Sequence, residues 1–145
     1  MKKPSLGFYV QKINDVVTTS ENVGEEMNPS YEKVRTAIDD NKVANLSKEE
    51  LTEIKELFLS GTNKYRELLA EITSLKAPAK VIGIHKKLEK SFTEYVEGCQ
   101  EMVDAIDADT VSVDEQFNTS ENKQDEATDT ISFCIQRVTQ LVLGK

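Results

Sequence analysis

The stretch that decides the fold class is residues 47–75, SKEELTEIKELFLSGTNKYRELLAEITSL. Its apolar positions recur every three or four residues without a slip, which is the pattern of one helix face. These positions are Leu51, Ile54, Phe58, Gly61, Tyr65, Leu68, Ile72 and Leu75. Ser47 and Glu50 have the spacing of a capping box, in which each side chain accepts from the other residue's backbone N–H. The stretch therefore predicts one long helix over residues 47–75.

Three further segments show the same spacing and predict helices over residues 6–40, 78–107 and 112–142. The four helices are of similar length, and the connections between them are short. Each helix must then run back along the one before it. We therefore predict an all-α protein, an antiparallel up-down-up-down four-helix bundle that forms a single domain over residues 1–145.

Two details of this prediction depend on single residues. Pro29 lies inside the first segment, where a proline costs about 3 kcal/mol, so the first helix is expected to be kinked or broken near it. Ser112 and Glu115 repeat the capping-box spacing, so the fourth helix is expected to begin at Ser112.

Charge and hydropathy exclude several classes of protein. The formal net charge is −8, and the stretch from Asp104 to Asp129 contains nine acidic residues and one basic residue, Lys123. Because nucleic-acid binding needs a cationic surface, we expect no nucleic-acid partner. No stretch of about 18 apolar residues predicts a membrane span. The first residues lack the apolar core of a signal peptide, so we expect a cytoplasmic protein.

The motifs of common enzymes and metal sites do not occur. The two cysteines lie far apart and lack zinc or redox spacing. A di-iron bundle needs two Glu-x-x-His pairs, and the chain has one histidine. The phosphate-binding loop and the nucleophile elbow are both missing, and the stretch from Asp107 breaks the calcium-loop pattern at Ser112 and Asn118. We therefore predict a protein that is not an enzyme and has no cofactor and no metal.

One candidate site pairs His85 with Cys134. The turn between the third and fourth helices is centred near residues 109–110, and both residues lie at about the same distance from it. In an antiparallel hairpin they should therefore lie at the same level on the core stripes. Such a pair suits thiol chemistry or half of a metal site. The alternative interpretation, which we favour, is that both residues pack in the core.

A second candidate site lies in the middle of the bundle. Small residues, Gly24 and Gly61, fall near the level of Phe92, Tyr95 and Gln124. They leave space for a ligand pocket between the helices, with a hydrogen bond between Tyr95 and Gln124. The alternative interpretation, which we favour, is that Phe92 fills the space.

Part of the third segment resembles a known pattern. Ala77, Pro78 and Ala79, followed by His85, Leu88, Tyr95 and Gly98, resemble a motif in small, uncharacterised helix-bundle proteins of Gram-positive bacteria. The resemblance implies a helical bundle and no particular chemistry.

The functional prediction combines these observations. We predict a non-enzymatic helical bundle that acts through protein interaction, with a protein partner or by self-association. Two alternatives stay open. One is a small-ligand binder or sensor with the mid-bundle pocket, and the other is thiol or metal chemistry at His85 and Cys134.

Overall fold

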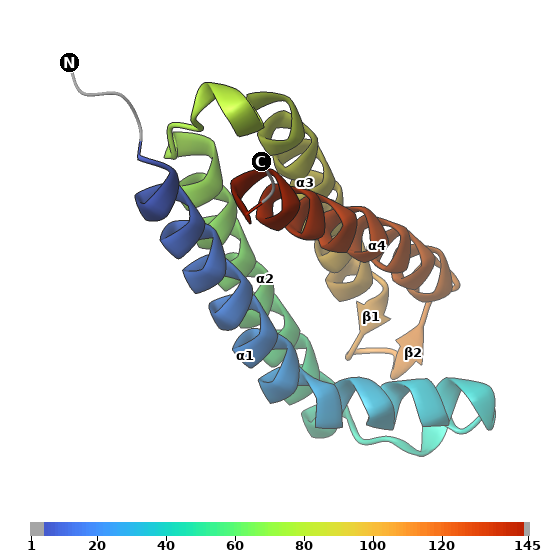
Figure 1. The fold of residues 1–145 in the computed structure, drawn as a ribbon. Coiled ribbons are helices and arrows are strands. Elements are labelled where there is room, and N and C mark those ends of the chain that lie inside the picture. The colour runs from blue at the N-terminus through green and yellow to red at the C-terminus, as the bar shows by residue number, and fades with distance from the viewer. Residues whose placement is uncertain (1–4, 144–145) are drawn as a thin grey trace.

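The computed structural model describes residues 5–143 and confirms an all-α bundle (Figure 1). Its four long helices are α1 (Leu6–Asp39), α2 (Lys48–Ser74), α3 (Ile82–Asp104) and α4 (Gln116–Leu143). Short 3₁₀ turns, η1 (Val43–Asn45) and η2 (Ala79–Val81), lie in the first two connections, and a small antiparallel ribbon, β1 (Ile106–Asp107) and β2 (Ser112–Val113), lies in the third. Among the helices of residues 5–143, none combines the length and the apolar character needed to cross a bilayer.

The helices are arranged as two hairpins. Figure 1 shows α1 lying along α2, and α3 lying along α4. The α3–α4 contact is the most extensive in the molecule, α2 packs against α3, and α1 touches α4 only sparsely. The bundle is therefore tightly closed on three sides and more open where α1 faces α4.

The first helix continues through Pro29 and bends. Residues Leu6–Asp39 are helical throughout, with Pro29 inside the helix. Figure 1 shows the cyan end of α1 turned away from the direction of its blue beginning. Proline cannot donate to the carbonyl one turn earlier, that of Glu25, and its ring pushes that turn open, which bends a helix without ending it. Of the two expected outcomes, the structure has the kink.

The start of α2 follows the prediction. The Glu50 N–H donates to Ser47 Oγ at 3.0 Å, and the Ser47 N–H donates to Glu50 Oε1 at 3.2 Å, which completes the capping box. These bonds satisfy two backbone donors that a helix N-terminus otherwise leaves without partners.

The connection between α3 and α4 differs from the prediction. The third helix ends at Asp104 and the fourth begins at Gln116. The prediction of helix at residues 105–107 and 112–115 was therefore wrong. Ile106 is completely buried and pairs with Val113 in the β1–β2 ribbon, and burial of this β-branched side chain competes with helix continuation. In place of the Ser112 capping box, the Asp114 carboxylate accepts from the Gln116 N–H at 2.8 Å.

The core consists of two clusters along the bundle axis. One lies at the end where α1 begins and centres on Tyr9, Leu88 and Cys134. The other lies beneath the β1–β2 ribbon and centres on Leu51, Ile106 and Phe117. Met27 of α1 packs against both clusters. Met27 therefore marks the junction of the two clusters.

Candidate ligand-binding site

Hydrogen bonds hold α1 against α3 and α4 at two levels. Near its start, the Tyr9 hydroxyl lies 2.8 Å from Nδ1 of His85 on α3. Beyond the bend, the Tyr31 hydroxyl donates to the Glu121 carboxylate on α4, and Arg35 Nη1 donates to Asn118 Oδ1 at 2.7 Å. Between Tyr9 and Tyr31, α1 runs for roughly 33 Å at ~1.5 Å per residue. Within residues 5–143, no hydrogen bond joins this central stretch to α4, and its bonds go to Tyr65 and Lys64 of α2.

A cavity of about 410 Å³ lies between α1 and α4 along this stretch. We call it the central cavity. Its inner wall is apolar and almost completely buried. The wall consists of residues from α1, α2 and α3: Ile13, Val16, Ile72, Leu88 and Phe92. Nearer the opening the wall is apolar and half-buried: Val17, Ile131 and Ile135. The space remains because Ser20 on α1 and Thr128 and Ser132 on α4 are too short to fill it.

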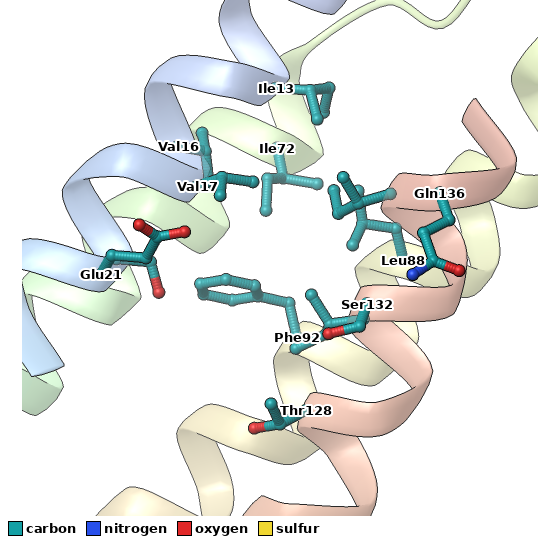
Figure 2. A pocket seen from close by; sticks show the side chains of 13 residues that line it. Ile13, Val16, Val17, Glu21, Ile72, Leu88, Phe92, Thr128, Ser132 and Gln136 are labelled. Atoms are coloured by element: carbon teal, nitrogen blue, oxygen red, sulfur yellow. The ribbon is translucent and has the colours of Figure 1, made fainter. Parts of the chain in front are cut away.

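The opening of the central cavity carries polar side chains. They come from α1 and α4: Ser20, Glu21, Thr128, Ser132 and Gln136. Figure 2 shows Glu21 on the α1 side, Ser132 and Gln136 on the α4 side, and the Phe92 ring pointing from α3 towards α1. Glu21 is the single charged residue of this lining, and its carboxylate lies at the rim, where it stays exposed.

An apolar cavity with a few polar groups at one side has the character of a small-molecule site. At ~30 Å³ per molecule, its volume corresponds to roughly 14 waters. The inner wall offers those waters no hydrogen-bond partners, so an apolar ligand can displace them at little cost. The hydroxyls and amide at the rim would orient the polar part of such a ligand.

The predicted mid-bundle residues are divided between two spaces. Gly24, Tyr95 and Gln124 line a second, smaller pocket of about 150 Å³ with Met27 and Tyr31. Phe92 lines the central cavity instead.

Gly61 is covered by another residue. The Met27 side chain occupies the place where a Cβ of residue 61 would be, so Met27, and not Phe92, fills the space over that glycine. The predicted hydrogen bond between Tyr95 and Gln124 is wrong, because Gln124 Nε2 donates to the Gly98 carbonyl at 3.2 Å.

The His85 ring uses both nitrogens in bonds to residues other than Cys134. Nδ1 lies against Tyr9, and Nε2 lies 3.1 Å from the Ile72 carbonyl and 3.0 Å from Glu89 Oε1. A carbonyl and a carboxylate only accept, so Nε2 carries a proton, and in the Nε2–H tautomer Nδ1 accepts from the Tyr9 hydroxyl. His85 thus joins α1, α2 and α3 as a buried structural residue.

Both thiols are buried and protonated. Burial raises the pKa of Cys99 to about 12, and burial likewise raises the pKa of Cys134. Because the thiolate is the reactive species, neither side chain has the electrostatic surroundings of a nucleophile. Within residues 5–143, no cluster of three or more His, Cys, Asp or Glu side chains is arranged to hold a metal ion.

Sequence reasoning missed most of the central cavity. Its inner wall consists of ordinary stripe residues, such as Ile13 and Leu88, which look the same in the sequence whether they fill a core or line a space. One available signal was the pair Thr128 and Ser132, two short polar residues at stripe spacing on the fourth helix. Both lie at the opening, where short side chains leave the space between α1 and α4 uncovered.

Comparisons with protein-family models, with curated proteins and with solved structures find no match to this chain. The resemblance to bundle proteins of Gram-positive bacteria stays a prediction.

Proposed function

We propose that the protein is a non-enzymatic binding protein that takes a small, largely apolar molecule into the central cavity. The observation that carries the proposal is the cavity itself, about 410 Å³ in volume and walled by side chains from all four helices. Ligand pockets of roughly 300–1,000 Å³ accept molecules of drug or metabolite size.

The position of the cavity supports reversible binding. It opens along the sparse α1–α4 contact, between the Tyr9–His85 bond and the Tyr31–Glu121 bond. Outward movement of the central stretch of α1 would widen the opening without breaking either bond. Burial of apolar ligand surface would supply the driving force, at about 25 cal/mol per Å².

Nile red, a neutral dye whose fluorescence rises in apolar surroundings, provides the test. We expect saturable binding with one dye per chain, and a higher melting temperature in its presence, because a ligand of the folded state stabilises that state. Ser132→Phe would place a ring in the cavity from its rim and should weaken binding at least about tenfold.

Thr139→Phe is the matched control, because Thr139 is exposed on the same helix and does not line the cavity. It should leave the dissociation constant unchanged. Non-saturable fluorescence, or equal affinities for the two variants, would show that the dye binds elsewhere and would refute the proposal.

Self-association is a second candidate function, and exposed aromatic residues favour it. Phe8 on α1 is 56% exposed and Phe133 on α4 is 51% exposed. Lys12 lies over the Phe8 ring and Lys87 over the Phe133 ring, at 5.6 and 5.0 Å from the ring centroids. Native mass spectrometry tests this candidate. A dimer that Phe8→Ser and Phe133→Ser dissociate would support it, and a monomer at micromolar concentration would exclude it.

A reducing, cytoplasmic compartment is part of the proposal. Both cysteines are free and buried, and free buried thiols are typical of proteins in a reducing environment.

A further inference from the structure

Acidic residues lie on or next to the rim of the central cavity on both helices that form it. On α1, Glu21 lines the opening, and Glu25 follows one turn later beside the bend, in a shallow depression that also includes Glu21. On α4, Asp125 lies one turn before Thr128, on the stripe that runs from Glu121 to the cavity-lining Ser132. Residues three or four apart share one helix face, so Asp125, three residues before Thr128, and Asp129, three residues before Ser132, lie on the side of α4 that borders the opening.

The residues that the structure describes leave these carboxylates without a salt-bridge partner. Within residues 5–143, neither Glu21 nor Glu25 nor Asp125 nor Asp129 forms an ion pair. Burial and the nearby charges of Glu121 and Asp129 raise the pKa of Asp125, as expected for a carboxylate that lacks a cationic neighbour.

Basic residues on the surrounding helices are paired with other carboxylates. Lys64 of α2 lies 3.4 Å from Glu26, and Lys123 of α4 lies 2.8 Å from Glu101 on α3. Arg35 is shared between Asp39 and Glu121, beyond the bend of α1. Within residues 5–143, the opening therefore presents an apolar interior and rim carboxylates that form no ion pair.

We propose that the ligand is a cationic amphiphile, with its apolar body in the central cavity and its ammonium group at the rim between Glu21 and the carboxylates of Asp125 and Asp129. This inference rests on the proposed function and names the chemical class of its ligand. A carboxylate head would be repelled by the same rim, and an uncharged head would gain only hydrogen bonds from Ser132 or Gln136.

Three probes with one alkyl chain and different heads test the inference: dodecylammonium, dodecanol and dodecanoate. Each is titrated below its micelle concentration, at low ionic strength, against bound Nile red. We expect dodecylammonium to displace the dye at about tenfold lower concentration than dodecanol, since partly exposed charge pairs each contribute modestly. Dodecanoate should be the weakest. Salt should reduce the advantage of the ammonium head and leave dodecanol unaffected.

Two double variants test which carboxylates cause the preference for the ammonium head. Glu21→Gln with Asp129→Asn should abolish the preference for ammonium and leave the affinity for dodecanol unchanged. Glu26→Gln with Glu126→Gln changes the net charge equally on the same two helices. Glu26 is directed to Lys64 of α2, and Glu126 lies on a face of α4 away from Thr128, so this variant should keep the preference. Circular dichroism checks that each variant stays helical.

The outcomes separate this inference from the proposed function. Equal displacement by all three probes, or tighter binding of dodecanoate, would overturn the cationic head and keep the apolar site. Failure of all three probes to displace Nile red would overturn the proposed function and this inference with it. An ammonium preference that both double variants reduce equally would reflect net charge alone and would also overturn the inference.

Discussion

The Tyr9 hydroxyl on α1 and the His85 ring on α3 form a buried hydrogen bond of 2.8 Å, and their rings meet edge to face at 5.4 Å between centroids. Burial raises the pKa of Tyr9 to about 12, so its hydroxyl keeps its proton and is able to donate a hydrogen bond to His85 Nδ1. This bond holds the first turns of α1 in place at one end of the central cavity.

Removal of the Tyr9 hydroxyl should destabilise the fold. Tyr9→Phe leaves His85 Nδ1 buried without a donor, which costs about 1–3 kcal/mol of unfolding free energy. Urea denaturation at pH 7 measures the change. In a His85→Leu background, which has no Nδ1 to satisfy, Tyr9→Phe should cost much less. Equal costs in both backgrounds would show that the bond contributes nothing.

The close approach of α3 and α4 depends on Gly98. A Cβ at this position would lie 2.9 Å from Gln124 Cγ and 3.3 Å from the Ser120 carbonyl oxygen, and the backbone carbonyl cannot move aside as a side chain can. Gly98→Ala should therefore destabilise the protein by about 1–3 kcal/mol.

Gly83→Ala is the matched substitution on the same helix, because nothing lies within 4 Å of the added Cβ. Alanine is the better helix former, so this variant should be unchanged or more stable by up to about 1 kcal/mol. Thermal unfolding of both variants checks the pair, and equal melting temperatures would contradict the close α3–α4 contact.

Two carboxylates should affect stability with opposite signs as pH changes. The folded-state pKa of Asp125 is raised above its ordinary 3.8, so its ionised form destabilises the fold at neutral pH. Asp125→Asn should raise the melting temperature at pH 7, and the gain should fade as pH falls towards 3.8.

Glu50 should show the reverse. A hydrogen bond from Lys33 and the Ser47 backbone N–H lower its pKa below the ordinary 4.5. Its charge therefore stabilises the fold above pH 4.5, and this contribution is lost as pH falls through the lowered pKa. Glu50→Gln should lower the melting temperature at pH 7 and have no effect at the acid end. Parallel pH profiles for the two variants would contradict these assignments.

Both thiols should be unreactive in the folded protein. Cys99, with a pKa of about 12, is almost entirely protonated at pH 8, and Cys134 is completely buried. A chromogenic disulfide reagent should titrate neither thiol in native buffer and both in guanidinium chloride. Cys99→Ser and Cys134→Ser assign any signal to its residue. Rapid native labelling of Cys134 would revive the thiol interpretation of that position.

The sequence predicted those structural features that depend on interactions between residues close together in the chain. The stripe from Leu51 to Ile72 and the Ser47–Glu50 capping box involve neighbours within one turn, and the structure reproduces both. The predicted capping box at Ser112 does not form, because Ile106 is buried in the cluster beneath the β1–β2 ribbon and Ser112 belongs to that ribbon. Local rules could not predict that burial, since the same cluster includes residues that are distant in the sequence, such as Val34 and Leu51.

The sequence by itself determined that the chain forms four long amphipathic helices and an antiparallel bundle, because helix periodicity and capping act over a few residues. Only the tertiary structure decided where this bundle is incompletely filled. The central cavity exists because Ser20 on α1 lies opposite Thr128 and Ser132 on α4, and all three side chains are short. Space between helices is set by the sizes of side chains that meet only after folding, and no single helix contains that information.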